Sequence, residues 1–190
     1  GVTVGSTRDT SSTGPAEERR VVEITTADTH DLRRRVLRVG TVTTEVRFAE
    51  DELPDTFHLG VEAGHLGVEA GHLGVETSVD DAGEPRLVAI STWVWRRHPD
   101  HPAFEGAQLR GMATDESVRG TGCGALLLQA GIARCRELGA GHVWARARDA
   151  ALDFYLAHGF VVFGAGYTDL PTGLPHHDVI HHLTPPTPPT

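Results

Sequence analysis

The sequence predicts a mixed α/β (α+β) domain in which strands and helices alternate along one chain. Short segments rich in β-branched and aromatic residues indicate strands, and other segments carry apolar residues at helical spacing. The chain has 190 residues, of which 39% are hydrophobic and 23% are charged. This length and composition are typical of one globular domain with a core of its own. We expect that domain to span residues 19–183.

The N-terminal part begins with residues 1–18, which are rich in Gly, Ser and Thr and are expected to form a flexible leader. Residues 21–24 are predicted to be the first strand. Thr29 precedes a predicted helix over residues 31–38. The apolar seam of that helix consists of Leu32, Val36 and Leu37.

Residues 58–76 contain two and a half copies of the heptad HLGVEAG. Two glycines in every seven residues cost a helix about 2 kcal/mol per repeat, which argues against a coiled coil. Within one copy the apolar residues alternate as in a strand, but the odd period moves those of the next copy to the opposite face. The segment therefore does not fit one continuous amphipathic strand. We expect one copy to form a strand and the others to lengthen a hairpin or bulge outward.

The second half of the chain holds the clearest elements. Strands are predicted over residues 86–95, 108–114, 142–147, 160–163 and 179–183. A long helix is predicted over residues 122–138, with an apolar seam of Ala125, Leu128, Ile132 and Cys135. A shorter helix over residues 150–158 ends at Gly159. Residues 184–190, TPPTPPT, are expected to form an extended polyproline-like tail.

Charge and residue types exclude several classes of function. The formal net charge of −9 argues against nucleic acid as a partner and is compatible with a cationic substrate. All 17 basic residues are arginine, so a Walker-type phosphate loop and a catalytic lysine are both excluded. The chain also lacks asparagine. Because lysine and asparagine both have AT-rich codons, their absence indicates a GC-rich and hence bacterial genome.

The sequence shows no signal for a membrane or for export. No run approaches the ~18–20 apolar residues of a membrane span, and the N-terminal residues lack the apolar core of a signal peptide. Cys123 and Cys135 lie roughly 18 Å apart on the predicted helix, which is too far for a disulfide. We therefore expect a cytoplasmic protein in a reducing compartment.

The segment that indicates chemistry lies between the predicted strand 108–114 and the predicted helix 122–138. Gly120, Gly122 and Gly124 would let the backbone approach a ligand without hindrance from a Cβ. The helix start offers unpaired N–H groups and the positive end of the helix dipole, which together bind anions. This pattern predicts a phosphate or pyrophosphate site, although a glycine cluster at a helix start is also compatible with a tight turn alone.

A dinucleotide site is one alternative for the same glycines. Gly120-x-Gly122-x-x-Ala125 satisfies the relaxed dinucleotide fingerprint. However, residues 115–119 separate the glycines from the strand end, where that fingerprint places them. No acidic residue follows at the spacing of about 20 residues that contacts the ribose. These two features make a nicotinamide-dependent oxidoreductase the weaker interpretation.

Arg119-x-x-Gly122-x-Gly124 resembles the Arg/Gln-x-x-Gly-x-Gly/Ala signature of the GCN5-related N-acetyltransferases, the GNAT family. The motif also has the family's position between a strand and a long helix. YLAHGF at residues 155–160 is similar to the end of the family's next helix, and GLPH at residues 173–176 resembles a turn of the ElaA/YjcF-like branch. The resemblance implies the GNAT fold, a central mixed and mostly antiparallel sheet with splayed parallel strands and flanking helices.

The resemblance also implies a binding mode for acetyl-CoA as cosubstrate. Its pyrophosphate would bind at the helix start, and its pantetheine arm would pair with the preceding strand. A backbone N–H of that strand would bind the thioester oxygen as negative charge develops there. The amine would attack directly, so Cys123 is expected to be a small loop residue and not a nucleophile. The cofactor-binding residues implied are Met112, Ala113, Thr114, Arg119, Gly120, Thr121, Gly122, Cys123, Gly124 and Tyr155.

Three residues are candidates for catalysis. Tyr155 is the expected general acid, because a phenol stays protonated at pH 7 and can protonate the departing thiolate. A purely packed aromatic residue is the alternative there. Glu116 and His176 are candidate general bases, the first because it lies near the loop and the second because histidine titrates near neutral pH. A solvated turn glutamate and a structural turn histidine remain alternatives, as does a glutamate of the repeat or a chain of waters.

Histidines are frequent. Those of the repeat, with its glutamates, are compatible with a metal site, although a repeat without chemistry is the preferred interpretation, and the two other groups lack the tight spacing of metal ligands. The groups are His58, His65 and His72 with Glu62, Glu69 and Glu76 of the repeat, His98 and His101, and His176, His177, His181 and His182. The implied reaction needs no metal, and none is expected. Arg148-Asp149 stands where many relatives carry an asparagine that contacts the cofactor arm, so that contact is not implied here.

We therefore expect a single-domain N-acetyltransferase that moves an acetyl group from acetyl-CoA to a primary amine of a small molecule or peptide. A catalytically silent acyl-CoA-binding module, acting as a sensor or as a partner of another protein, is the alternative from a different class. The repeat enlarges a hairpin near the expected acceptor side, so the acceptor of relatives does not carry over. An extended hairpin of this kind would also allow a homodimer.

Overall fold

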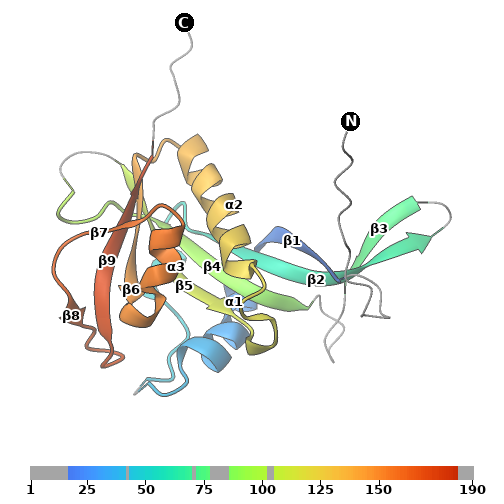
Figure 1. The fold of residues 1–190 in the computed structure, drawn as a ribbon, viewed down its shortest axis with the longest axis horizontal. Coiled ribbons are helices and arrows are strands. Elements are labelled where there is room, and N and C mark those ends of the chain that lie inside the picture. The colour runs from blue at the N-terminus through green and yellow to red at the C-terminus, as the bar shows by residue number, and fades with distance from the viewer. Residues whose placement is uncertain (1–16, 42, 70–71, 78–85, 102–104, 184–190) are drawn as a thin grey trace, which may run out of the picture.

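The segments rich in β-branched and aromatic residues form one sheet at the centre of the molecule (Figure 1). The computed structural model describes residues 17–41, 43–69, 72–77, 86–101 and 105–183. Within them the strands follow the order β1-β2-β4-β5-β6-β9-β7, with β3 beside β2 and β8 beside β9. Of these neighbours only β5 and β6 run parallel, which confirms the expected mixed, mostly antiparallel sheet. The strands are β1 (Glu17–Ile24), β2 (Phe57–Glu69), β3 (His72–Thr77), β4 (Leu87–Trp95), β5 (Gly106–Thr114), β6 (His142–Arg148), β7 (Val161–Val162), β8 (Tyr167–Thr168) and β9 (Pro175–His182).

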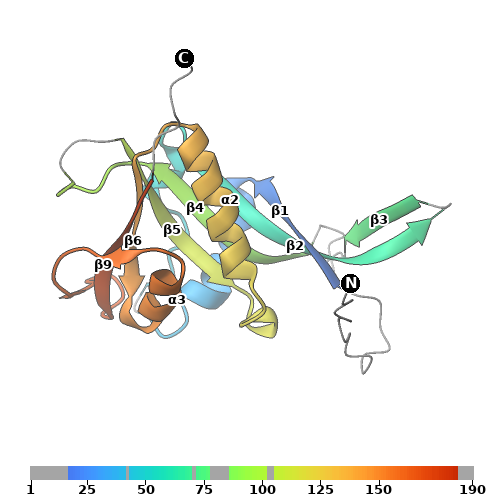
Figure 2. The ribbon, with the colours of Figure 1, turned by 45° about the horizontal axis from the view of Figure 1, so that its top comes forward.

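Helical elements cover both faces of the sheet (Figures 1 and 2). They are α1 (Thr26–Leu32), the π-helical turn η1 (Arg33–Leu37), the 3-10 turns η2 (Ala49–Glu52), η3 (Glu116–Val118) and η4 (Asp149–Ala151), α2 (Cys123–Glu137) and α3 (Leu152–Ala157). α2 lies across β4 and β5 on one face and packs on the larger core cluster. α1 and η1 pack on the other face, where Leu32 joins Ile90 and Ala113. The flanking helices expected from the sequence are thus present.

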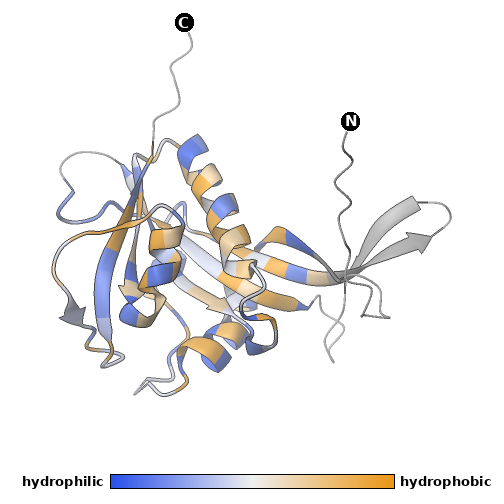
Figure 3. Cartoon of the chain, viewed as in Figure 1, coloured by the Kyte–Doolittle hydropathy of each residue, from blue (hydrophilic) through white to orange (hydrophobic). Residues whose placement is uncertain are grey.

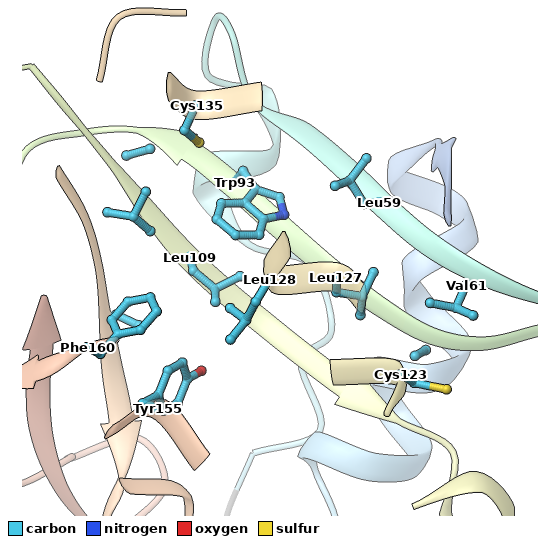
Figure 4. Packing of buried hydrophobic residues seen from close by; sticks show 14 of the residues in the cluster. Leu59, Val61, Trp93, Leu109, Cys123, Leu127, Leu128, Cys135, Tyr155 and Phe160 are labelled. Atoms are coloured by element: carbon cyan, nitrogen blue, oxygen red, sulfur yellow. The ribbon is translucent and has the colours of Figure 1, made fainter. Parts of the chain in front are cut away.

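The main core lies between α2 and the sheet, and Figure 4 shows its central side chains. Trp93 of β4 is fully buried there, with its indole N–H donating to the Ser91 hydroxyl at 2.9 Å. A Cβ at Gly131 of α2 would lie 1.9 Å from the Trp93 ring. The helix can therefore approach the sheet this closely only because residue 131 has no side chain.

The buried face of α2 is turned from the seam expected for it. Leu128 and Cys135 are buried as predicted, but Ala125 and Ile132 are only partly buried. Leu127 takes a fully buried position instead, because the helix orients itself around the contact between Gly131 and Trp93. In Figure 3, apolar and polar residues alternate along the ribbon of α2.

The first helix begins earlier than predicted. Thr25, and not Thr29, is the N-cap residue: its hydroxyl accepts from the N–H of Asp28, whose carboxylate accepts from the N–H of Thr25. This reciprocal pair satisfies two N–H groups that a helix start otherwise leaves unpaired. The predicted range 31–38 therefore covers only the last residues of α1 and the π-helical turn that follows.

The heptad repeat forms a hairpin that extends the sheet outward (Figure 2). β2 runs through the first copy and most of the second, and the third copy forms β3. Residues 58–65 pair with β1, whereas residues 64–69 pair with β3. The expected lengthened hairpin is confirmed. β2 nevertheless continues as one strand across two copies, with a shift of its register to β4 between Val61 and Glu62.

The end regions differ in detail from the predictions. β1 begins at Glu17, so the last two residues of the expected leader belong to the first strand. The predicted strands 160–163 and 179–183 correspond to β7 and to a longer β9, and β8 was not predicted. Residues 1–16 and the expected tail 184–190 lie outside the described residues. None of the helices in the described ranges is long and apolar enough to cross a membrane.

Candidate active site

The site begins where the parallel strands β5 and β6 separate. Their pairing extends only from Gly106 opposite His142 to Leu109 opposite Ala145. Beyond these residues β6 still pairs with β9, while β5 has no hydrogen-bonded neighbour on that side among the described strands. The splayed parallel strands expected from the sequence are confirmed. The open edge of β5 offers backbone N–H and C=O groups to an extended ligand.

A bulge in β5 lies at this opening. The register with β4 shifts between Ile90 and Thr92, so Gly111 and Met112 together oppose one residue of β4. Gly111 has a φ of +56°, and a Cβ there would lie 2.7 Å from the ring of Phe48. The position therefore favours glycine on two grounds. Sequence reasoning missed this bulge, although a lone glycine inside a strand pattern is its usual signal.

A cavity of about 480 Å³ opens at the bulge, a size typical of small-molecule sites. Residues of β5 and of the end of β6 line it, together with residues that follow η1 and β8. Predicted site residues in its lining are Met112, Ala113, Thr114, Arg119, Tyr155 and His176. The fold thus brings six of them, far apart in the sequence, to one cavity.

The glycine loop lies at the start of α2, next to but outside the lining of that cavity. Gly122 is the N-cap residue with a φ of +93°, and Gly120 has a φ of +74°. A Cβ at either residue would meet nothing within 4 Å, so the backbone is accessible on this side. Because the first N–H groups of a helix have no partner within the helix, this start leaves donors available to an anion, and the predicted pyrophosphate site stays a prediction.

The other residues of the loop have structural contacts. The Thr121 hydroxyl donates to the Val118 carbonyl and accepts a bond of 2.5 Å from Arg19 of β1. Cys123 is buried, and both cysteines are free, as expected. A Cβ at Gly124 would lie 3.0 Å from Phe154. Gly124 is therefore explained by the packing of α2 against α3.

Tyr155 of α3 lines the cavity and is 7% exposed. Its ring packs edge-on against Phe160, with centroids 5.2 Å apart, and Figure 4 shows the two rings side by side. Its hydroxyl has no hydrogen-bond partner among the described residues. Burial raises the pKa of Tyr155, so the phenol stays protonated at neutral pH. The residue is thus both packed and available to a ligand in the cavity.

His176 of β9 also lines the cavity and is 6% exposed. Its Nδ1 lies 2.9 Å from the carbonyl of Leu174. Because a carbonyl only accepts, Nδ1 carries the proton, and Nε2 of the neutral ring has a free lone pair. The ring stacks on Tyr167, with centroids 5.9 Å apart. This geometry fixes the tautomer that a proton acceptor requires.

Glu116, the other candidate base, has a different environment. It lies in the turn η3, is exposed, and does not line the cavity. The glutamates of the repeat at Glu69 and Glu76 belong to the hairpin β2–β3, and their side chains lie outside the described part of the structure. No group of three potential metal ligands occurs among the described residues.

Arg148 and Asp149 occupy the place of the family's asparagine. The Arg148 guanidinium lines the cavity and donates to the Leu37 carbonyl at 3.0 Å. Asp149 accepts from Nδ1 of His177 at 2.6 Å. These contacts join the end of β6 to η1 on one side and to β9 on the other. Sequence reasoning did not assign either residue to the site.

A comparison with family models identifies the protein family to which this chain belongs. The model of the Acetyltransferase (GNAT) family matches residues 47–160, more than half of the chain. This chain belongs to the GNAT acetyltransferase family. The resemblance seen in the Arg119-x-x-Gly122-x-Gly124 motif is confirmed, and the chain is an N-acetyltransferase.

Relatives of this GNAT acetyltransferase support the assignment. It is 28% identical over 161 residues to YitI of Bacillus subtilis, an uncharacterized N-acetyltransferase, and the match covers 85% of this chain and 93% of YitI. Escherichia coli ElaA has a TM-score of 0.59 at 16% identity, over 86% of this chain and 99% of ElaA. FeeM, an N-acyl amino acid synthase from uncultured soil microbes, has a TM-score of 0.63 at 13% identity, over 88% of this chain and 92% of FeeM. These structures share the fold.

Proposed function

We propose that this acetyltransferase moves an acetyl group from acetyl-CoA to a primary amine by direct attack. The observation that carries the proposal is the cavity at the splay of β5 and β6, which Tyr155 and His176 both line. The open edge of β5 would pair with the pantetheine arm, and the start of α2 would bind the pyrophosphate. The accessible backbone at Gly120 and Gly122 supports this placement.

His176 is the proposed general base, and Tyr155 the proposed general acid. Nε2 of His176 would take a proton from the amine as the C–N bond to the acetyl carbon forms. A backbone N–H at the β5 bulge would bind the resulting oxyanion until the C–S bond breaks. The phenol of Tyr155 would then protonate the coenzyme A thiolate. Burial favours the neutral form of a thiol as it does that of a phenol, so both groups hold their protons more tightly in this site.

Acetyl-CoA binding, measured by calorimetry, is the first test. Arg119→Glu puts a negative charge beside the proposed pyrophosphate site and is expected to weaken binding at least 10-fold. Arg119 suits this purpose because substitution of Gly122 would also strain its φ of +93°. Arg136→Glu, at an exposed residue near the other end of α2, is the matched control. Absence of binding to the wild type would overturn the proposal.

Turnover separates an enzyme from a silent acyl-CoA-binding module. Release of the coenzyme A thiol is followed with a panel of primary amines at saturating acetyl-CoA. Tyr155→Phe is expected to lower kcat by roughly 100-fold or more, because a general acid contributes that much, and to weaken acetyl-CoA binding far less than it lowers kcat. Full turnover in Tyr155→Phe would remove the residue from the mechanism. Binding without release from any amine would favour the silent module.

A further inference from the structure

Arginine side chains dominate the cavity, although the chain as a whole has a net charge of −9. The basic lining residues are Arg38, Arg110, Arg119, Arg146 and Arg148. Among the described residues, Asp169 is the one acidic residue that lines it. The charge at the site is therefore opposite in sign to the charge of the molecule, and it is the local charge that acts on a bound substrate.

Most of these guanidinium groups lack a carboxylate partner. Arg110 pairs with Glu50 at 2.5 Å. Arg38 donates to the Glu45 carbonyl at 2.6 Å, and Arg148 donates to the Leu37 carbonyl. Carbonyl contacts orient a guanidinium group but do not neutralise it. Neither of these two arginines has a carboxylate within 4 Å among the described residues, and the same holds for Arg146.

The carboxylates nearest to the cluster are engaged elsewhere. Asp169 accepts from the backbone N–H and the hydroxyl of Thr172. Asp178 lies opposite Arg146 in the register of β6 and β9, but its oxygens bind His98 at 2.7 Å and the Tyr167 hydroxyl at 2.6 Å. The charge of Asp169 still acts on Arg38, but one carboxylate does not balance the arginines of the lining, so the cavity keeps an excess of positive charge for a ligand.

The arginines also repel one another. The pKa of Arg38 is lowered, chiefly by burial and then by the charges of Arg148, Arg110 and Arg33. The pKa of Arg110 is lowered by burial and by Arg146, although Glu50 opposes the shift. A bound anion would relieve this repulsion, and guanidinium groups bind carboxylate and phosphate oxygens in pairs.

The lining arginines other than Arg119 (Arg38, Arg110, Arg146 and Arg148) form a cluster that the sheet separates from the start of α2. Leu109, Ala145 and Ala147 belong to the core that faces α2. Because successive side chains of a strand point to opposite faces, Arg110, Arg146 and Arg148 point to the face of α1 and η1. The contact of Arg148 with Leu37 of η1 agrees with this direction. The cluster thus lies on the side of the sheet away from the proposed pyrophosphate site.

The cluster is also next to the proposed base. Arg148 and His176 are directly opposite in the register of β6 and β9. Side chains of such a pair share a face, with Cβ atoms about 5 Å apart. An anionic group held by Arg148 would therefore be only a few bonds from an amine that reaches Nε2 of His176.

We propose that the acceptor is a small amine that carries a carboxylate or phosphate group within a few bonds of its nitrogen, bound by Arg38, Arg146 and Arg148. This inference rests on the proposed acetyl transfer and names its substrate class. The cationic substrate compatible with the net charge of the chain is replaced by an amine with an oxyanion, because the charge around the cavity is positive.

The test compares amines of one skeleton in the assay of coenzyme A release. The set is β-alanine, its amide, ethylamine, and 2-aminoethyl phosphate, all at saturating acetyl-CoA. We expect kcat/KM for β-alanine or for the phosphate to exceed that for the amide and for ethylamine by roughly 10- to 100-fold. This is the change in affinity that hydrogen bonds between charged groups typically produce. Comparison of β-alanine with the phosphate shows which oxyanion the site takes. Values of kcat/KM for the amide and for ethylamine equal to those for β-alanine and for the phosphate would overturn the inference while leaving acetyl transfer in place.

Arg146→Gln tests whether the arginine cluster causes the preference for amines that carry an oxyanion. We expect it to raise KM for the favoured oxyanion about 10-fold, to leave KM for the amide unchanged and to keep acetyl-CoA binding intact. Arg34→Gln, at an exposed residue of η1, is the matched control. Weaker acetyl-CoA binding by Arg146→Gln would assign the cluster to the coenzyme A phosphates and so overturn the inference. Absence of acetyl-CoA binding by the wild type would instead overturn the proposed function.

Discussion

Phe48 shows how single residues shape the acceptor side of the cavity. Two guanidinium groups lie over its ring, that of Arg33 at 3.7 Å and that of Arg110 at 4.5 Å from the ring centroid. Arg33 is fully buried and binds Asp51 through two hydrogen bonds of 2.8 and 2.9 Å. Asp51 also accepts from the N–H of Phe48 at 3.0 Å. The buried ion pair of Arg33 and Asp51 therefore holds Phe48 in two ways, through the contact of Arg33 with its ring and through the hydrogen bond from its backbone N–H.

Asp51→Asn is expected to destabilise the fold by about 3–5 kcal/mol, because it leaves the buried charge of Arg33 without its partner. The free energy of unfolding in urea measures the loss. Asp31→Asn is the control, since the Asp31 carboxylate pairs with Arg35 at 69% exposure and is expected to contribute at most about 0.5 kcal/mol. A loss at Asp51 no larger than that of the control would contradict the role assigned to the pair.

At the scale of elements, the contact of α2 with β4 determines how the helix lies on the sheet. In an open helix position, Gly→Ala stabilises by up to about 1 kcal/mol. Gly131→Ala is expected to destabilise by about 1–3 kcal/mol or more, because the added methyl would meet the Trp93 ring. The free energy of unfolding in urea measures the change, and its sign distinguishes an open position from a closely packed one. A stabilised variant would show that the helix packs less closely than described.

A second contact between elements joins η1 to the turn before α2. Hydrogen bonds from Arg35, which has the larger effect, and from Ser117 lower the pKa of Asp115 to about 2. The unfolded chain has a value near 3.9. The folded state therefore favours the ionised carboxylate, and this stability is present above about pH 4 and is lost as the pH falls toward 2.

Asp115→Asn is accordingly expected to cost about 1–2 kcal/mol at pH 7, with a smaller cost at pH 3. Urea unfolding of both proteins at the two pH values gives the difference. Glu137→Gln, which removes an exposed carboxylate near the end of α2, is the control for a change of net charge. A cost at pH 3 equal to that at pH 7 would exclude the Asp115 carboxylate as its source.

At the scale of the whole molecule, the hairpin of the repeat is separate from the site. Beyond residue 65, β2 pairs only with β3 among the described strands. As far as the structure describes them, neither strand contributes a residue to the cavity lining. The outer hairpin is thus an extension of the sheet edge, and the repeat needs no role in binding acetyl-CoA.

Replacing residues 66–75 by Asn-Gly tests this separation. His65 and Glu76 are register partners, so a two-residue turn can join them. We expect acetyl-CoA affinity within a factor of two and a melting temperature within a few degrees of the wild type. Loss of acetyl-CoA binding by a folded variant would show that the hairpin contributes to the site. A change from dimer to monomer in sedimentation would assign it to an interface between copies of this chain.

The elements that the sequence predicts well are those with strong local signals. The glycines of residues 119–124 are a local feature of backbone conformation, and the predicted helix start next to them is confirmed, since α2 begins after Gly122. The start of α1 was wrong because two threonines compete as caps, and only the partner of Thr25, Asp28, decides between them. The orientation of α2 was wrong because Trp93, distant in the sequence, selects the buried face.

The sequence by itself determined the family, the strand and helix order, and the place of the glycine loop, because each depends on residues close together in the chain. Only the tertiary structure decided which side chains share the cavity. Arg38 follows η1, Arg146 belongs to β6 and Asp169 follows β8, and no spacing in the sequence relates them. Charge acts through distance in space, so a chain with a net charge of −9 can still hold a positive site.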